Sequence, residues 1–237
     1  MEDRPPDSPE PSPPPSYVYD APSEPPPAGP GVIPWEEPGR PWLSGLVETI
    51  KLLFTSPRAA FERVPLETSL LRPYSFALLL GLVGLYGEVA FLIMNLGASR
   101  AMLPPGAPDP FATIPPMLLP AFFVCLPLFV VLPGIIINTA VLHVALLIVG
   151  GAQKGFGATF RTSCYSYAGA LLLAIPFCGG LIGGVAQLVL LAIGLSTVHR
   201  IGIGRAIAAV ALPVAACCAC ILAFMLFAMT MAGAKHP

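Results

Sequence analysis

The sequence predicts an all-α, polytopic membrane protein: a bundle of about five transmembrane helices that follows a disordered, proline-rich N-terminal tail. Of the 237 residues, 55% are hydrophobic and only 11% are charged, whereas about 25% are charged in a typical soluble domain. Prolines and acidic residues gather at the N-terminus, and long apolar runs begin only near residue 75. Together these observations indicate that most of the chain lies in a membrane.

Residues 1–41 form the predicted tail. They contain 15 of the 30 prolines and have a formal charge of −6, while residues 42–237 have a formal charge of +5. Such a segment cannot bury enough apolar surface to fold. Its Pro14-Pro15-Ser16-Tyr17 matches the PPxY pattern of a ligand for an aromatic-lined groove. The alternative is that the tail is a solvated spacer whose many prolines produce this match by chance. With no apolar run in the first 30 residues, we expect no signal peptide.

Residues 42–72 are predicted to form two short amphipathic helices beside the membrane. In the first helix apolar side chains recur at helical spacing: Leu43, Leu46, Val47, Ile50, Leu53 and Phe54. Ser56-Pro57 has the pattern of an N-cap followed by a first-turn proline, which opens the second helix. The helices suit the lipid headgroup region, and packing against the bundle would produce the same pattern.

Residues 73–231 contain the predicted spans, since about 20 helical residues cross a 30 Å hydrocarbon core. Residues 75–97 give the first. The stretch 117–150 is interrupted by three prolines, so its span is placed at 126–150. Residues 160–198 fit two short spans joined by a tight turn at 175–180, or a re-entrant pair. The last span is 206–231, and a short exoplasmic tail follows at 232–237.

The basic residues predict the topology, because cytoplasmic loops carry an excess of Lys and Arg. Five spans with a cytoplasmic N-terminus leave only Arg100 and Lys235 on the exoplasmic side. Seven others fall on the cytoplasmic side: Arg58, Arg63, Arg72, Lys154, Arg161, Arg200 and Arg205. The excess of nine Arg over three Lys, with abundant Ala, Pro and Gly, favours a GC-rich bacterial genome and an inner (cell) membrane.

Glu88, Asn138 and His143 form the candidate intramembrane polar site. Glu88 lies near the middle of the first predicted span, where ionisable groups are rare and functional by default. A carboxyl group and an imidazole that face each other could share a proton, relay one, or coordinate a cation. Glu88 could equally hydrogen-bond Asn138, Gln187 or a carbonyl group and so fix the packing of the helices.

Small residues predict close helix packing. Gly81, Gly84 and Gly87 lie on one side of the first span, and two overlapping GxxxG spacings occur at the hairpin: Gly179, Gly180, Gly183 and Gly184. Such faces let helix backbones approach each other. They predict a tight bundle, and they would also serve a homo-oligomer.

No pattern for catalysis, metal binding or nucleic-acid binding is found. The closely spaced Cys217, Cys218 and Cys220 point in different directions on a helix, without a nearby acid or histidine to complete a metal site. There is no HExxH, no GxSxG and no phosphate-binding glycine loop, and no dense basic patch with aromatic residues. Ser196 and His199 lie close together, but at a helix end without oxyanion geometry. We expect no enzyme, cofactor, metal or nucleic acid.

Several short motifs in order resemble a known family. They are Pro34-Trp35-Glu36, Pro41-Trp42, the run from Phe54 to Phe61, Leu142-His143, Gly150-Gly151, Phe156, Thr159, Arg161, Tyr165-Ser166-Tyr167, Ile175-Pro176, Gly179-Gly180, Gly194 and His199. Over residues 42–231 this order resembles the YIP (Ypt- or Rab-interacting protein) domain family, in the branch found in bacteria. The resemblance implies five spans, a cytoplasmic N-terminus and an exoplasmic C-terminus. Eukaryotic members bind prenylated Rab-type GTPases, but their acidic Tyr-Gly-Pro signature is missing here.

The expected function is that of a non-enzymatic integral membrane scaffold or adaptor. Its tail and juxtamembrane helices would face cytoplasmic protein partners or membrane lipids. The alternative is a small-solute, ion or proton transporter that uses Glu88 and His143.

Overall fold

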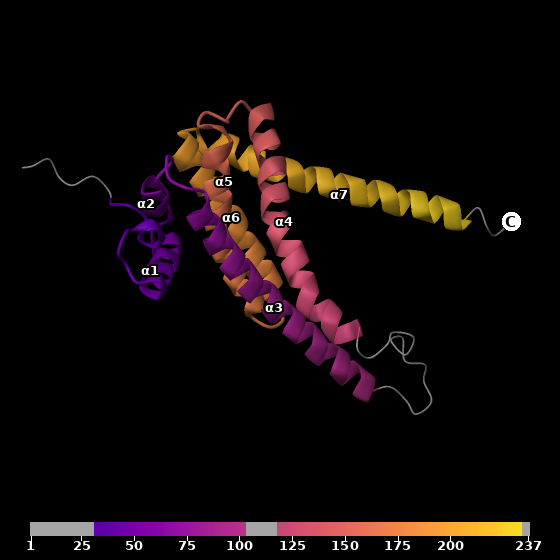
Figure 1. Ribbon diagram of the computed structural model, residues 1–237. Coiled ribbons are helices and arrows are strands. Elements are labelled where there is room, and N and C mark those ends of the chain that lie inside the picture. The colour runs from indigo at the N-terminus through magenta and orange to yellow at the C-terminus, as the bar shows by residue number, and fades with distance from the viewer. Residues whose placement is uncertain (1–30, 103–117, 234–237) are drawn as a thin grey trace, which may run out of the picture.

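The computed structural model describes residues 31–102 and 118–233. Most of the predicted tail, with its PPxY motif, and residues 234–237 lie outside the described residues. The described part is helical, with no strand. In chain order its elements are η1 (Pro34–Glu36), α1 (Trp42–Thr55), α2 (Pro57–Glu62), α3 (Leu71–Ala101), α4 (Leu118–Ile148), α5 (Gly155–Ser166), η2 (Tyr167–Ala174), α6 (Gly179–His199) and α7 (Ile203–Gly233) (Figure 1).

Four helices in the described part are long and apolar enough to cross a membrane, which confirms the predicted fold class. These stretches are Leu71–Ser99 in α3, Phe123–Ile148 in α4, Gly179–His199 in α6 and Ile203–Thr230 in α7. Two of the predicted spans, 75–97 and 206–231, fall within α3 and α7, and 126–150 extends two residues beyond the end of α4.

The fifth predicted segment corresponds to α5 and η2, which follow each other without a break. An α-helix of twelve residues and a 3₁₀ helix of eight together rise about 34 Å, close to the thickness of a bilayer core. The segment packs between α3 and α6, and α5 also contacts α4. A turn from Ile175 to Cys178 then leads into α6. The expected tight hairpin is therefore present, with a 3₁₀ stretch in its first arm.

The prolines of α4 do not break it, contrary to the expectation from the sequence. The helix runs continuously from Leu118 to Ile148 through Pro127 and Pro133. Neighbouring helices and side chains can satisfy the backbone that a proline disturbs in a membrane helix. Two tyrosines of α3 do reach across to α4 carbonyl groups: the hydroxyl of Tyr74 donates to Leu132 at 3.0 Å, and that of Tyr86 to Val124 at 2.7 Å.

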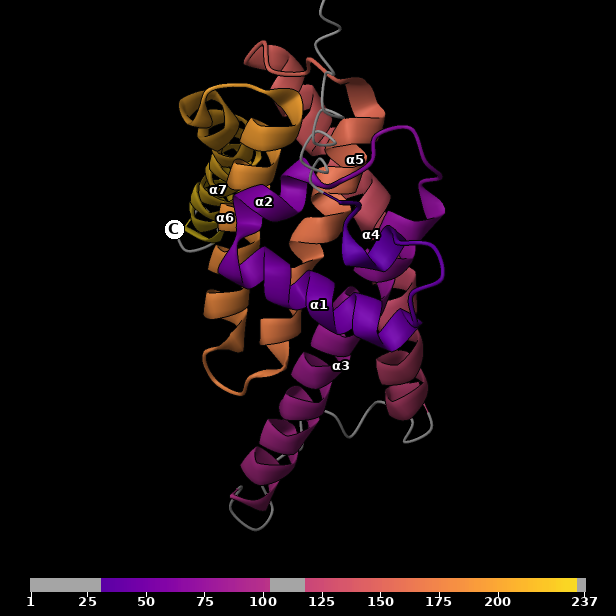
Figure 2. The same cartoon turned by 90° about the vertical axis from the view of Figure 1, so that its left-hand side faces the viewer.

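Helix α1 lies across the bundle, transverse to α3 (Figure 2). Leu46, Thr49 and Leu53 are buried against the body of the protein. Leu43 and Val47, which belong to the predicted apolar face, are more than half exposed. One face of α1 therefore packs on the protein, as one of the two possibilities required, and a second apolar stripe remains uncovered.

Helix α7 leaves the bundle soon after it begins (Figure 1). Ala206, Ala209 and Val210 are buried against α4 and α6, while the described residues from Ala211 onward are largely exposed. In a membrane this apolar surface would face lipid. The ends of α3, α6 and α7 that meet near α2 carry Arg72, Arg200 and Arg205, and we call this the basic end of the bundle.

Candidate functional site

A buried ion pair connects the segment before α1 to the centre of the bundle. The guanidinium Nη1 of Arg161, in α5, lies 3.4 Å from Oε1 of Glu36, and the two side chains are only 1% and 3% exposed. The same carboxylate accepts hydrogen bonds from the hydroxyl groups of Tyr165 at 2.6 Å and Thr68 at 2.8 Å. We call these four residues the clamp. Buried charges are tolerated only when they are paired and hydrogen-bonded in this way.

Arg161 also holds the loop between α2 and α3. Its Nη2 donates to the backbone carbonyl of Thr68 and, at 3.3 Å, to that of Ser69. Because Arg161 and Tyr165 are four residues apart, they lie on the same face of α5. One helical face thus anchors both the loop and Glu36.

Trp35 makes a second set of connections beside the clamp. Its backbone N–H donates to the hydroxyl of Thr49 in α1 at 2.9 Å, and its indole N–H donates to the carbonyl of Arg72 at 2.7 Å. Its ring packs edge-on against Phe76 at 5.9 Å. Helix α1 comes so close that a Cβ on Gly45 would lie 2.9 Å from the carbonyl oxygen of Pro34. The packed body therefore begins at about residue 33, inside the predicted tail.

His143 takes part in a hydrogen-bonded chain at the basic end. Its Nδ1 lies 2.9 Å from the hydroxyl of Thr159, which lies 3.1 Å from Nε2 of His199. The backbone N–H of Lys154 donates to Nδ1 of His199 at 3.2 Å. That bond assigns the proton of a neutral His199 to Nε2, which then donates to the hydroxyl of Thr159. The carbonyl oxygen of Gly155, 3.4 Å from the same hydroxyl, accepts from Thr159. The chain joins α4, α5 and α6.

Glu88 lies far from that chain, and the structure does not bring the predicted polar site together. Tyr86 pairs with Val124 near the start of α4, and His143 lies 19 residues further along the same helix, a rise of about 28 Å. Asn138 is exposed on α4. Oε1 of Glu88 is 3.3 Å from where a Cβ on Gly180 would be, in the first turn of α6, where the helix dipole favours an acidic group.

The glycines of α3 face η2 of the same chain. A Cβ on Gly84 would meet the carbonyl oxygen of Ala170, and a Cβ on Gly87 would lie 2.6 Å from Cα of Ala174. Gly183 in α6 approaches η2 from the other side. The predicted tight bundle is therefore formed within one chain at these positions.

The clamp was not predicted from the sequence. Arg161 was counted among the basic residues of the cytoplasmic loops, but the structure buries it in α5. Two signals pointed to the pairing: an acid within a Trp-containing motif, and an arginine four residues before a tyrosine in an apolar segment. In the part of the chain that the structure describes, no three His, Cys, Asp or Glu side chains gather as a metal site would require.

A comparison with models of known protein families gave a match over most of the chain. The Yip1 domain matches residues 51–225, a range that includes both α5 residues of the clamp, the whole of α3, α4 and α6, and α7 as far as Met225. Neither the curated proteins nor the solved structures gave a match. The matched range covers well over half of the sequence, and the chain therefore belongs to the Yip1 domain family.

Proposed function

We propose that this protein is a non-enzymatic membrane scaffold or adaptor, in which the bundle holds the juxtamembrane segment in a fixed position for a cytoplasmic partner. The observation that carries the proposal is the clamp. It fixes η1 and the loop after α2 to the centre of the bundle through Glu36 and Arg161, which are 125 residues apart in the sequence.

The surface that this arrangement presents supports the same reading. The clamp and Trp35 hold α1 across the bundle, with Trp42, Leu43 and Val47 between 55% and 64% exposed. An exposed apolar stripe on a rigidly held helix suits the headgroup region or a partner helix.

The basic end is proposed to face the cytoplasm, because membrane proteins retain Lys and Arg on that side. A fusion of a fluorescent protein that folds only in the cytoplasm tests this orientation. Fused before Met1 it should fluoresce, and fused after Pro237 it should not. Fluorescence at both ends would contradict the proposed five crossings.

The adaptor role is tested by crosslinking in cells followed by purification. The full chain is compared with a chain that starts at Gly31, which removes the tail but retains Trp35 and Glu36. A start at Trp42 would also remove part of the clamp and confuse loss of the tail with loss of the fold. A specific partner lost on truncation places recognition in the tail.

A second variant tests the stripe on α1. Val47→Glu puts a charge on the exposed face, and Thr55→Glu places the same charge at the exposed end of the helix, about 12 Å further along, as a control. A partner retained by the truncated chain and lost only in Val47→Glu places recognition on α1. No specific partner for any version of the chain would argue against the adaptor role.

A further inference from the structure

A cavity of about 1230 Å³ opens at the basic end, between α2, the last turns of α6 and the turn into α7. Three basic side chains line it, Arg58, Lys154 and Arg200, against one acidic side chain, Glu62. Glu62 pairs with Arg58 at 3.4 Å, so the cavity retains a net positive charge. Ser196 and Thr197 on the last turn of α6 also line it, and their hydroxyl groups donate to the backbone carbonyl groups of Ile201 and Ile193.

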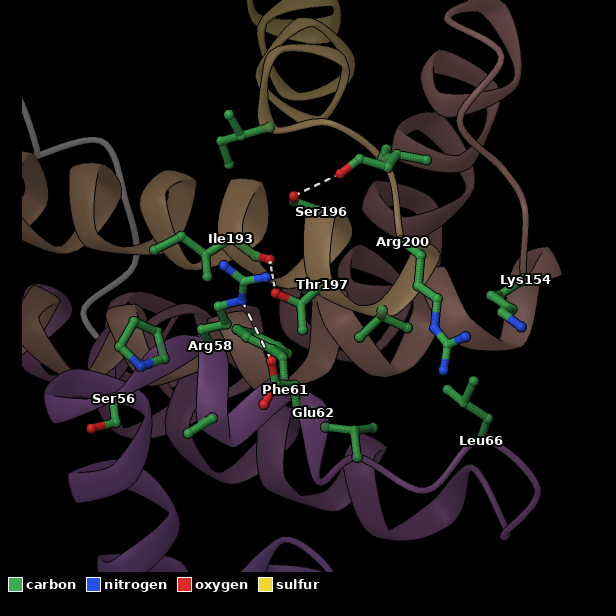
Figure 3. Close-up of a pocket in the computed structure, with 16 residues that line it drawn as sticks. Ser56, Arg58, Phe61, Glu62, Leu66, Lys154, Ile193, Ser196, Thr197 and Arg200 are labelled. Atoms are coloured by element: carbon green, nitrogen blue, oxygen red, sulfur yellow. Dashed lines mark hydrogen bonds and ion pairs between the residues drawn. The ribbon is translucent and has the colours of Figure 1, made fainter. Parts of the chain in front are cut away.

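The basic groups come from separate elements (Figure 3). Arg58 extends from α2 towards Thr197 on α6, and Arg200 extends from the turn after α6 towards Leu66. Positive charge is therefore present on more than one side of the cavity. Arginine is well suited to this role, because its planar guanidinium matches the oxygens of a phosphate group.

The backbone at Arg200 is unusual for an arginine. The residue has φ 55° and ψ 43°, the left-handed conformation that closes α6. Glycine adopts this conformation at the least cost and is the commonest residue at such a position. A strained residue beside a cavity points to a function for its side chain rather than to stability.

An apolar groove continues from the cavity. It lies between α6 and α7, has a volume of about 630 Å³, and is lined only by aliphatic side chains. Ile193 and Ile203 line both the cavity and the groove. From Ile203 to Ala215 the groove follows α7 for about 18 Å away from the basic end. A charged compartment thus leads directly into a long apolar one.

We propose that the cavity and the groove together bind one anionic phospholipid. The phosphate of the headgroup lies against Arg58, Lys154 and Arg200, and an acyl chain occupies the groove between α6 and α7. A soluble anion would use only the cavity, and an apolar peptide would gain nothing from its positive charge. The ligand that uses both the positively charged cavity and the apolar groove is therefore an anionic lipid. It comes from the bilayer in which α6 and α7 lie.

Lipid titration followed by native mass spectrometry tests the charged part. The full chain is purified in a mild detergent and titrated with phosphatidylglycerol or with phosphatidylcholine of the same acyl chains. One phosphatidylglycerol should bind in preference. The double variant Arg58→Gln/Arg200→Gln should weaken its binding roughly 25-fold, about fivefold for each charge. Arg205→Gln is the control, because this exposed arginine lines neither compartment.

Arg200→Gly separates lipid binding from folding. Glycine relieves the left-handed strain, so this variant should be at least as heat-stable as the parent chain and still bind phosphatidylglycerol about fivefold more weakly. Unchanged binding in Arg200→Gly and in the double variant would overturn the proposal, as would equal binding of the two lipids.

The groove is tested with a pair of adjacent substitutions. Ala215→Phe fills the groove, whereas Ala216→Phe adds the same bulk to an exposed neighbour that does not line it. Only Ala215→Phe should weaken binding of phosphatidylglycerol. If it is silent, and inorganic phosphate displaces the lipid completely, the site holds a soluble anion and the phospholipid proposal is wrong.

Discussion

Replacing Glu36 by Gln should strongly destabilise the protein, because it leaves Arg161 charged and unpaired in the interior. The exchange keeps the size of the side chain but removes its charge and one of its two accepting oxygens, so the hydrogen bond from either Tyr165 or Thr68 is disturbed as well. Removing one partner of a buried ion pair costs about 3–5 kcal/mol. The side chains of Glu36 and Arg161 are 3% and 1% exposed, so little solvent is available to compensate.

Glu37→Gln provides the matched control in the neighbouring position. Glu37 pairs with Arg40 at 2.6 Å, but these side chains are 44% and 28% exposed, and exposed pairs contribute little to stability. Unfolding in mixed micelles can be followed through the fluorescence of Trp35, which is buried beside the clamp. A Trp42→Phe background removes the signal of the exposed second tryptophan. Equal midpoints for the two Gln variants would refute the reasoning.

A double-mutant cycle tests whether the effect comes from the pair. Glu36→Met and Arg161→Met should each be severe, since each leaves one buried charge. The double variant removes both charges and should be less destabilised than the sum of the single variants by several kcal/mol. Additive effects would mean that the two residues do not act together.

Further predictions use the same unfolding assay. Gly84→Leu should destabilise by about 1–3 kcal/mol because its Cβ would meet a backbone carbonyl of η2, whereas Gly97→Leu in the same helix, with no atom within 4 Å of its Cβ, should have little effect. Thr159→Val breaks the hydrogen-bonded chain between His143 and His199 and should lower the free energy of unfolding by about 1–3 kcal/mol. Thr139→Val loses only a hydrogen bond within its own helix and should lower it less. Trp35→Phe removes the indole hydrogen bond and should cost about 1 kcal/mol from that bond; because this variant also lacks the fluorescent reporter, its unfolding is followed by circular dichroism instead.

The elements that depend on local pattern were predictable from the sequence. Apolar length defined α3 and α7, and the Ser56-Pro57 signal marked the start of α2, where Ser56 is the N-cap residue although its side chain makes no capping bond. The continuity of α4 through its prolines was not predictable, because a proline has different consequences in water and beside packed membrane helices. Local propensity alone suggested a break there.

The candidate site was harder to predict, because it depends on contacts between distant segments. Glu88 drew attention as the acid in the middle of a predicted span, and it does lie near the middle of α3, but it is beside the first turn of α6 and far from His143. Glu36 was noted only as part of a family motif, because it lies in a proline-rich segment that was assigned to the tail. No periodic pattern can pair Glu36 with Arg161 across 125 residues; only the fold brings them together.

Helix α5 lies at the centre of the bundle. This position explains why its sequence is polar and why it is not one of the four long apolar helices. All residues of Ala158–Ser166 are buried, and α3, α4 and α6 all pack on α5, so protein rather than lipid surrounds it.

Lipid tails are as apolar as leucine, which removes the hydrophobic drive for helices to associate in a membrane. Polar groups and close backbone contacts must then specify the assembly. Thr159, Arg161 and Tyr165 supply such polar groups, and they belong to the motifs that carry the resemblance to the family. Those motifs therefore identify a fold, and a partner or ligand particular to this chain is to be sought on surfaces that the fold leaves open: the exposed stripe of α1 and the basic cavity beside α7.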